Sequence, residues 1–325
     1  MKKPFLLLFL ILIFVFFVFG QAASDFRYAE NTSIGEISIT GYSGSLKDIV
    51  IPNRINNLPV TSIVDRAFAG NRLTSVIIPD SVISIGIGAF ADNRIAHVGI
   101  PDSITSIEKD TFANNRLASV TIPNSVTYIG HSAFANNHLT SISIPFGVTH
   151  LSGFNDNRLT IVTIPGSVTE IGLDAFAGNR LTIADVPESV VLIGSGAFAR
   201  NNLTMAVIPN SVKEIGSGAF AKNRLTTITI PDSVTEISGK SFMGNRLTNA
   251  VIPGSVTAIR DEAFTGNRLA SIAIGSNVEI ASRQATAAGD HNNAFDNRFA
   301  EFYRTQGLRA GTYTYRMGRW NAQVR

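Results

Sequence analysis

Apolar and polar positions alternate along the chain in a unit that returns about every 22 residues. Within residues 73–94, Val76 and Ile78 recur at the period of two that is typical of a strand with one buried face. Pro79 follows and ends the strand, because proline has no N–H to donate to a neighbouring strand. The pattern therefore predicts one short strand at the start of each unit.

The second half of each unit predicts a turn of helix. Val82 and Ile85 are apolar at a three-residue spacing and lead into Phe90, which favours a single α-helical or 3₁₀ turn. Asn93 closes that turn, since Asn tolerates the left-handed conformation found at the end of a short helix.

A phenylalanine closes each unit, and successive ones are 22 residues apart except for a step of 20 from Phe134 to Phe154. The series is Phe68, Phe90, Phe112, Phe134, Phe154, Phe176, Phe198, Phe220, Phe242 and Phe264. A fixed period of this size predicts a solenoid. One unit alone buries too few apolar side chains, each contributing about 1.5–3 kcal/mol, to offset an ordering cost of about 1.5 kcal/mol per residue. Stacked neighbours must supply the rest.

Eleven predicted strands would form one continuous parallel sheet. They start at Leu46, Leu73, Ile95, Leu117, Leu139, Leu159, Leu181, Leu203, Leu225, Leu247 and Leu269. The ends depart from the period, as the ends of a solenoid must. Residues 23–45 are expected to form an N-terminal cap with a hairpin at 36–44, residues 46–298 the solenoid, and residues 299–325 a C-terminal cap with a helical turn followed by a hairpin.

The N-terminal segment, residues 1–22, has the features of a secretory signal peptide. Lys2 and Lys3 precede fifteen apolar residues and then a small-residue stretch. An uncleaved membrane anchor is the alternative, but fifteen residues are fewer than the roughly 20 needed to span a bilayer. We therefore expect an exported protein, whether extracellular, on the cell surface or periplasmic, with no membrane span after signal cleavage.

Composition narrows the classes of partner. The chain of 325 residues is 45% hydrophobic and 16% charged, which is typical of a folded protein. It has no cysteine, so neither a disulfide nor a lipidated N-terminal cysteine is possible. Without Lys2 and Lys3 the net charge falls from +3 to about +1, which gives no case for nucleic acid as a partner.

The motif L-x-x-V/I-x-I-P-x-S-V-T-x-I-G-x-x-A-F resembles the BspA-like, or Treponema-type, class of bacterial leucine-rich repeats over about residues 46–298. The resemblance implies an α/β leucine-rich-repeat solenoid that forms an arc, with a parallel β-sheet on its concave side and a cap at each end. It also implies a secreted or surface protein that adheres to host matrix, host cells or other bacteria. The chain departs from many members in having Asn-Arg-Leu where they have Cys-x-x-Leu.

Two polar columns accompany the repeat. The Asn column, of which Asn93 and Asn179 are examples, is expected to satisfy backbone groups in the turn rather than to face a ligand. In the Arg column beside it, Arg158, Arg180, Arg224 and Arg246 are candidates for binding a polyanion. The alternative is a solvated edge whose Arg side chains cover the turn and whose charge is balanced by nearby acids.

An apolar strip on the outward face of the strands is the main candidate binding site. Most positions two after each Leu are small and polar, but three consecutive units carry Ile161, Ile183 and Met205, with Val207 next along the strand. An exposed apolar strip rimmed by polar residues indicates a recognition surface. The alternative is that these residues only reflect strand propensity.

Catalytic chemistry has little support. The five histidines show no pairing at metal-ligand or catalytic spacing, and no nucleophile elbow or phosphate-binding loop is present. Glu170, Glu214 and Glu236 share a column that is best interpreted as a surface stripe. The sequence thus predicts no enzyme, cofactor or metal. It predicts a binding protein for an extracellular or envelope macromolecule, protein or glycan, with a structural or scaffolding envelope protein as the alternative.

Overall fold

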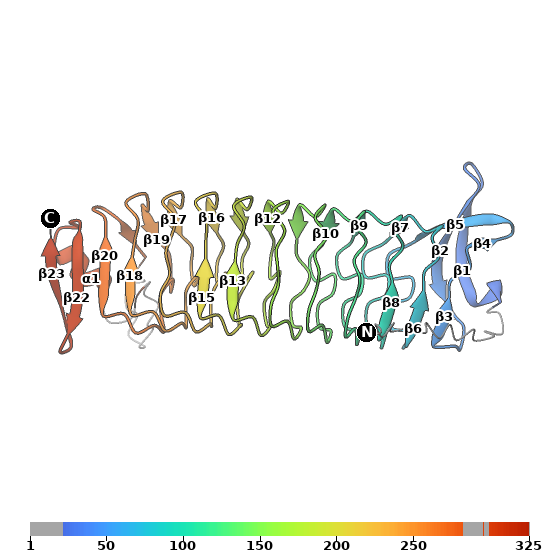
Figure 1. Cartoon of the computed structure of the whole chain (residues 1–325), viewed down its shortest axis with the longest axis horizontal. Coiled ribbons are helices and arrows are strands. Elements are labelled where there is room, and N and C mark those ends of the chain that lie inside the picture. Colours follow the sequence, from blue (N-terminus) through green and yellow to red (C-terminus); the bar gives the residue numbers. More distant parts are fainter. Residues whose placement is uncertain (1–21, 282–294, 296–298, 325) are drawn as a thin grey trace, which may run out of the picture.

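Each repeat folds into one coil, and the coils follow one another along the long axis of the molecule (Figure 1). The computed structural model describes residues 22–281, 295 and 299–324. In the view of Figure 1 the row of coils is nearly straight, without the pronounced arc that the resemblance implied. The predicted signal peptide lies outside the described residues except for its last position.

The strands predicted at the start of each unit form in most coils. They are β3 (Asp48–Val50), β6 (Ser75–Ile77), β8 (His97–Gly99), β13 (Ile183–Asp185), β15 (Met205–Val207), β18 (Asn249–Val251) and β20 (Ser271–Ile274). They pair in parallel within three separate sheets. The coils that start at Leu117, Leu139, Leu159 and Leu225 have no such strand, and a single bridge joins Ser143 to Thr163. The expectation of one continuous sheet is therefore wrong.

A second row of strands lies where a helical turn was expected. It consists of β7 (Ser84–Ile85), β9 (Ser106–Ile107), β10 (Tyr128–Ile129), β11 (His150–Leu151), β12 (Glu170–Ile171), β14 (Leu192–Ile193), β16 (Glu214–Ile215), β17 (Glu236–Ile237), β19 (Ala258–Ile259) and β21 (Glu279–Ile280). Six of these, from β9 to β16, form the longest parallel ladder in the described part of the chain.

The hydrogen bonds explain why the expected helical turns are wrong. The N–H of Val82 donates to the carbonyl of Pro79, so the chain turns a corner there and the three-residue spacing to Ile85 spans a corner rather than a helix. Around Phe90, successive N–H groups donate alternately to a carbonyl of the same coil and to a carbonyl of the next coil. The N–H of Ala91 donates within its own coil, whereas that of Phe90 donates to Thr111 in the next coil. A helix needs consecutive bonds within one segment, and this alternation prevents it.

The phenylalanines form a continuous stack through the core. From Phe68 to Phe264 the ring centroids of neighbouring coils lie 5.1–5.9 Å apart and the rings are stacked. Phe295, which lies outside the predicted series, extends the stack at 5.0 Å from Phe264. All of these rings are buried. Every coil thus packs its largest apolar side chain on the coils before and after it, as one-dimensional stacking requires.

The 20-residue coil keeps this spacing although it is shorter. Phe134 and Phe154 are 5.4 Å apart, within the range of the other steps. The missing residues come from the turn before the ring, where Gly153 has a φ of +93°. A Cβ at Gly153 would lie 2.5 Å from the carbonyl oxygen of Gly130, so only glycine allows the shortened coil to approach its neighbour this closely.

The N-terminal end differs from the coils. After η1 (Ala23–Asp25), β1 (Phe26–Asn31) pairs antiparallel with β2 (Glu36–Tyr42), so the hairpin lies earlier than expected. β2 then pairs in parallel with β5 (Leu58–Ile63), which also pairs with β4 (Arg54–Ile55) and β7. Phe26 and Tyr42 pack against the ring of Phe68, with centroids 6.3 and 6.0 Å away.

The C-terminal segment forms the expected helix and hairpin. α1 (Phe299–Thr305) precedes β22 (Gly311–Arg316) and β23 (Arg319–Val324), and β22 pairs antiparallel with β20. Phe299 contacts Phe295 edge to face and packs against Tyr313 and Trp320. That this segment is required as a cap stays a prediction. Among the described residues, no helix has the length and hydrophobicity to cross a membrane.

Candidate binding surface on the strand face

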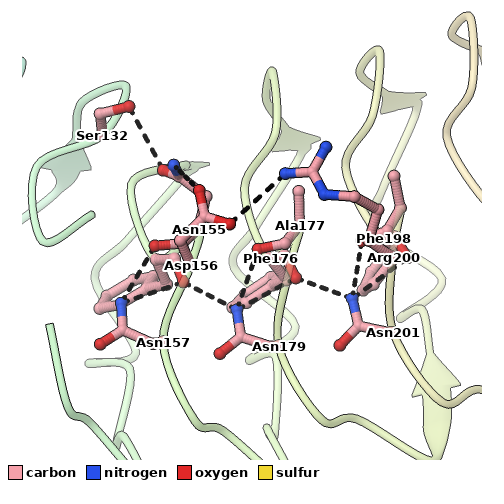
Figure 2. Close-up of polar contacts among 12 residues, drawn as sticks. Ser132, Asn155, Asp156, Asn157, Phe176, Ala177, Asn179, Phe198, Arg200 and Asn201 are labelled. Carbon is pink, nitrogen blue, oxygen red and sulfur yellow. Dashed lines mark hydrogen bonds and ion pairs between the residues drawn. The ribbon is translucent and has the colours of Figure 1, made fainter. Parts of the chain in front are cut away.

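The asparagine column is structural, as the sequence predicted. The side-chain amide of Asn179 donates to the carbonyls of Phe176, Ala177 and, one coil earlier, Phe154, at 2.8–3.4 Å. Its Oδ1 accepts from the N–H of Leu159 at 3.0 Å. Figure 2 shows Asn157, Asn179 and Asn201 aligned with the same geometry. These amides are buried and fully used by the backbone, so they are not part of a ligand site.

Ile161, Ile183, Met205 and Val207 form the apolar patch on the strand face. Their exposed fractions are 69%, 48%, 48% and 47%. β13 and β15 align Ile183 with Met205 in parallel register, while Ala184, the residue after Ile183 along β13, is buried. The patch therefore consists of large side chains in water on adjacent coils, which is the geometry of a recognition surface.

A hollow adjoins the apolar patch between the coils that start at Leu159 and Leu181. It has a volume of about 320 Å³ and is lined by Ile161 and Ile183 together with threonines and Pro187. No strand pairing joins these two coils on this face, since β13 pairs with β15 on its other side. The break in the ladder thus leaves space beside the exposed isoleucines.

Phe146 is an exposed aromatic that the sequence reasoning missed. It follows Pro145 in the coil that starts at Leu139, one coil before that of Ile161, and is 76% exposed. The equivalent residues after the prolines of other coils are polar or glycine, such as Asp80, Asn124 and Gly166. An aromatic residue in a column that otherwise holds polar residues or glycine was the available signal.

The arginine row consists of exposed arginines that recur in most coils at the position before the Leu or Ile that starts the coil. Its described members are Arg72, Arg94, Arg116, Arg158, Arg180, Arg224, Arg246 and Arg268, with His138 and Asn202 in register between them. None of these arginines makes an ion pair in the described part of the chain. The acids that could have balanced them, such as Asp80, Asp102 and Asp232, do not reach them.

Ion pairs form elsewhere on the surface. The guanidinium of Arg200 lies 3.4 Å from a carboxylate oxygen of Asp156, two coils away, across Gly178 (Figure 2). A Cβ at Gly178 would lie 2.2 Å from the Asp156 carboxylate, so the glycine leaves room for this pair. Arg260 donates to Glu236 at 2.6 Å, and this hydrogen bond lowers the pKa of the Glu236 carboxyl. The arginine row differs from these sites in having no anionic partner.

The repeat pattern is matched by a known family. The profile described as BspA type leucine rich repeat region matches in six copies, over residues 32–153, 61–182 and 152–271. Together these regions cover most of the chain. The chain belongs to the BspA-type leucine-rich repeat family.

Solved structures of bacterial leucine-rich repeat proteins resemble this BspA-type chain. One from Bacteroides ovatus is 26% identical with a TM-score of 0.60, and the match covers 78% of this chain and 67% of that one. A leucine rich cell surface protein from Faecalibacterium prausnitzii is 26% identical with a TM-score of 0.49, covering 79% and 89%. The leucine rich repeat protein of T. pallidum is 26% identical with a TM-score of 0.45, covering 57% and 85%. No curated protein matches the sequence.

This BspA-type chain carries one contact between a histidine and an acid that sequence spacing did not reveal. His150 Nδ1 lies 3.2 Å from Glu170 Oε2 on the next coil, and the ring of Tyr128 stacks on His150 at 4.9 Å. In the same ladder Leu192 separates Glu170 from Glu214, so these two carboxylates do not form an acid pair on adjacent coils. The described residues contain no group of three or more potential metal ligands.

Proposed function

We propose that the chain is an exported, non-catalytic binding protein whose apolar patch contacts a protein partner outside the cytoplasm. Membership in a family of repeat proteins supports a role in interactions, because a solenoid presents one extended surface. The observation that carries the proposal is the group formed by Ile161, Ile183, Met205 and Val207, each about half exposed or more. Such residues contribute most to affinity when a partner excludes water from them.

Export is supported by the charged start, the short apolar run and the small residues after it. We expect the exported protein to begin near Ala23. N-terminal sequencing of the protein recovered outside the cytoplasm checks this, and a sequence that begins with Met1 would contradict it.

The binding role is tested by replacing the patch. The triple variant Ile161→Thr, Ile183→Thr and Met205→Thr places a β-branched residue that suits strands at each position, so the fold should be retained. Wild-type protein on a solid support is incubated with host-matrix and bacterial-surface fractions, and proteins that it retains are titrated against both forms. We expect the triple variant to bind at least tenfold more weakly, a loss of about 1.4 kcal/mol or more.

A matched control removes the same kind of side chain from another part of the coils. Ile83, Ile87 and Leu173 are 58%, 44% and 49% exposed and lie outside the starting strands. The variant with threonine at these three positions should bind as the wild type does. Equal affinity of the wild type and the patch variant would rule out the patch and favour a structural or scaffolding role for the repeats.

A further inference from the structure

The arginine row presents positive charge without local compensation, and this observation is independent of the apolar patch. A guanidinium recurs in every coil of the row except those of His138 and Asn202, and adjacent coils are separated by ring distances of 5.1–5.9 Å in the core. Like charges at such spacing repel one another. The exposed arginines have no ion pair among the described residues, so an added anion would relieve this repulsion.

The C-terminal half of the row is the more positive half. Two positions before the row, the earlier coils carry Asp92 and Asp156, which bring negative charge near Arg94 and Arg158. From Arg180 onward that position holds Gly178, Arg200, Lys222, Gly244 and Gly266. Arg200 is committed to Asp156, but Lys222 is exposed and adds to the charge. The binding segment is therefore the run from Arg180 to Arg268.

Hydroxyl groups lie beside these cations. The residue after each buried Leu is exposed, and in this half it is Thr182, Thr204, Thr226 or Thr248. The Arg before the Leu and the Thr after it are thus both exposed, on either side of a buried side chain. The hydroxyl of Thr204 donates to the carbonyl of Thr182 at 3.3 Å, which leaves the hydroxyls of Thr182, Thr226 and Thr248 as the donors beside the row. Guanidinium and hydroxyl donors in neighbouring columns can together bind the oxygens of sulfate or carboxylate groups.

We infer that the row from Arg180 to Arg268 binds an extended anionic polysaccharide that carries sulfate or carboxylate groups and runs along the solenoid axis. A linear polymer with repeated charges matches a linear row with an arginine in four of its five coils, the exception being Asn202, whereas a single small anion would use only one or two coils. Single-stranded nucleic acid is less suited to the site, since its bases need aromatic platforms and the row and its flanking columns carry no Phe, Tyr or Trp in the described residues.

The test compares two variants with equal loss of charge. The row variant carries Arg180→Gln, Arg224→Gln, Arg246→Gln and Arg268→Gln. The control variant carries Arg66→Gln, Lys109→Gln, Lys213→Gln and Arg309→Gln, at exposed positions outside the row. Binding to heparin is measured at salt concentrations from about 50 to about 200 mM, with dextran as the uncharged polymer and thermal unfolding as the check on folding.

We expect the wild type to bind heparin but not dextran, the row variant to bind heparin at least tenfold more weakly, and the control to change less than threefold. The salt dependence of the row variant should also be shallower, because fewer counterions are released. The patch variant should bind heparin as the wild type does, which separates this result from the proposed function. Equal losses in the row and control variants, no binding by the wild type, or equally tight binding of single-stranded DNA would overturn the inference.

Discussion

The interior and the strand face of the same coils differ in how much their residues vary. Inside, each coil repeats a buried Phe and a buried Asn, because both contact the coil before or after them. On the strand face the equivalent position holds Ser75, His97, Ile161, Met205 or Asn249, while the stack of buried rings continues through all of these coils. Contacts between coils fix the interior sequence, whereas the face is free to take residues that suit a ligand.

Removal of residues 299–325 should have the largest effect, because it uncovers the interior at one end. β20 would lose its pairing with β22, and the Phe stack would lose the aromatic residues that follow Phe295. An unpaired strand edge beside exposed apolar rings favours association between molecules. We expect aggregation or a lowered melting temperature, measured by light scattering and circular dichroism. A truncated protein that stays monomeric with unchanged melting would show that the segment is not needed as a cap.

Phe198→Ala should cost about 3–5 kcal/mol of unfolding free energy, the usual range for removing a buried aromatic side chain. The ring stacks on both neighbours, at 5.6 and 5.5 Å. Met205→Ala, on the strand face of the next coil, should change stability by less than about 1 kcal/mol. Urea denaturation of the two variants measures the difference, and similar losses would remove the contrast between interior and face.

Asn179→Ala should cost about 1–3 kcal/mol, because it leaves the buried N–H of Leu159 without a partner. The N–H of Leu159 loses its acceptor, whereas the carbonyl of Phe154 keeps a donor in the side-chain amide of Asn157. Asn249→Ala is the matched control, since Asn249 is exposed on β18, and should stay within about 0.5 kcal/mol. Equal effects at the two positions would contradict the structural role of the buried asparagines.

The smallest effect on stability is expected for the patch variant with threonine at positions 161, 183 and 205. Exposed substitutions of this kind usually change stability by no more than about 0.5 kcal/mol each. A midpoint of denaturation close to that of the wild type would agree with this expectation. A large loss would mean that the isoleucines pack against the core, so that weaker binding could not be assigned to a lost surface.

The sequence predicted the buried Phe and Asn positions better than it predicted the path of the chain between them. The Phe series and the Asn column recur at the same spacing, so the period of the repeat was enough to predict both as structural positions. The spacing of Val82 and Ile85 was misread as a helix, because a corner in the chain gives the same three-residue spacing. The alternation of hydrogen bonds within and between coils leaves no trace in the order of residues.

For the candidate site, side-chain parity predicted which residues face water but not what surrounds them. Ile161 and Ile183 were expected to be exposed and are. The hollow beside them depends on a missing strand pairing between two coils, which no pattern within one repeat encodes. Likewise, acids close in sequence to the arginine row could be excluded as partners only from the fold.

The 20-residue coil has a consequence for the length of the molecule. Its ring spacing of 5.4 Å falls among those of the 22-residue coils, so the axial advance is set by stacking and not by the number of residues in the coil. Insertions and deletions at a corner of a coil change the cross-section of that coil, while only the gain or loss of a whole coil changes the length of the solenoid. The length of the solenoid is therefore set by the number of its coils. Duplication of one repeat would lengthen it by one ring spacing without altering either end.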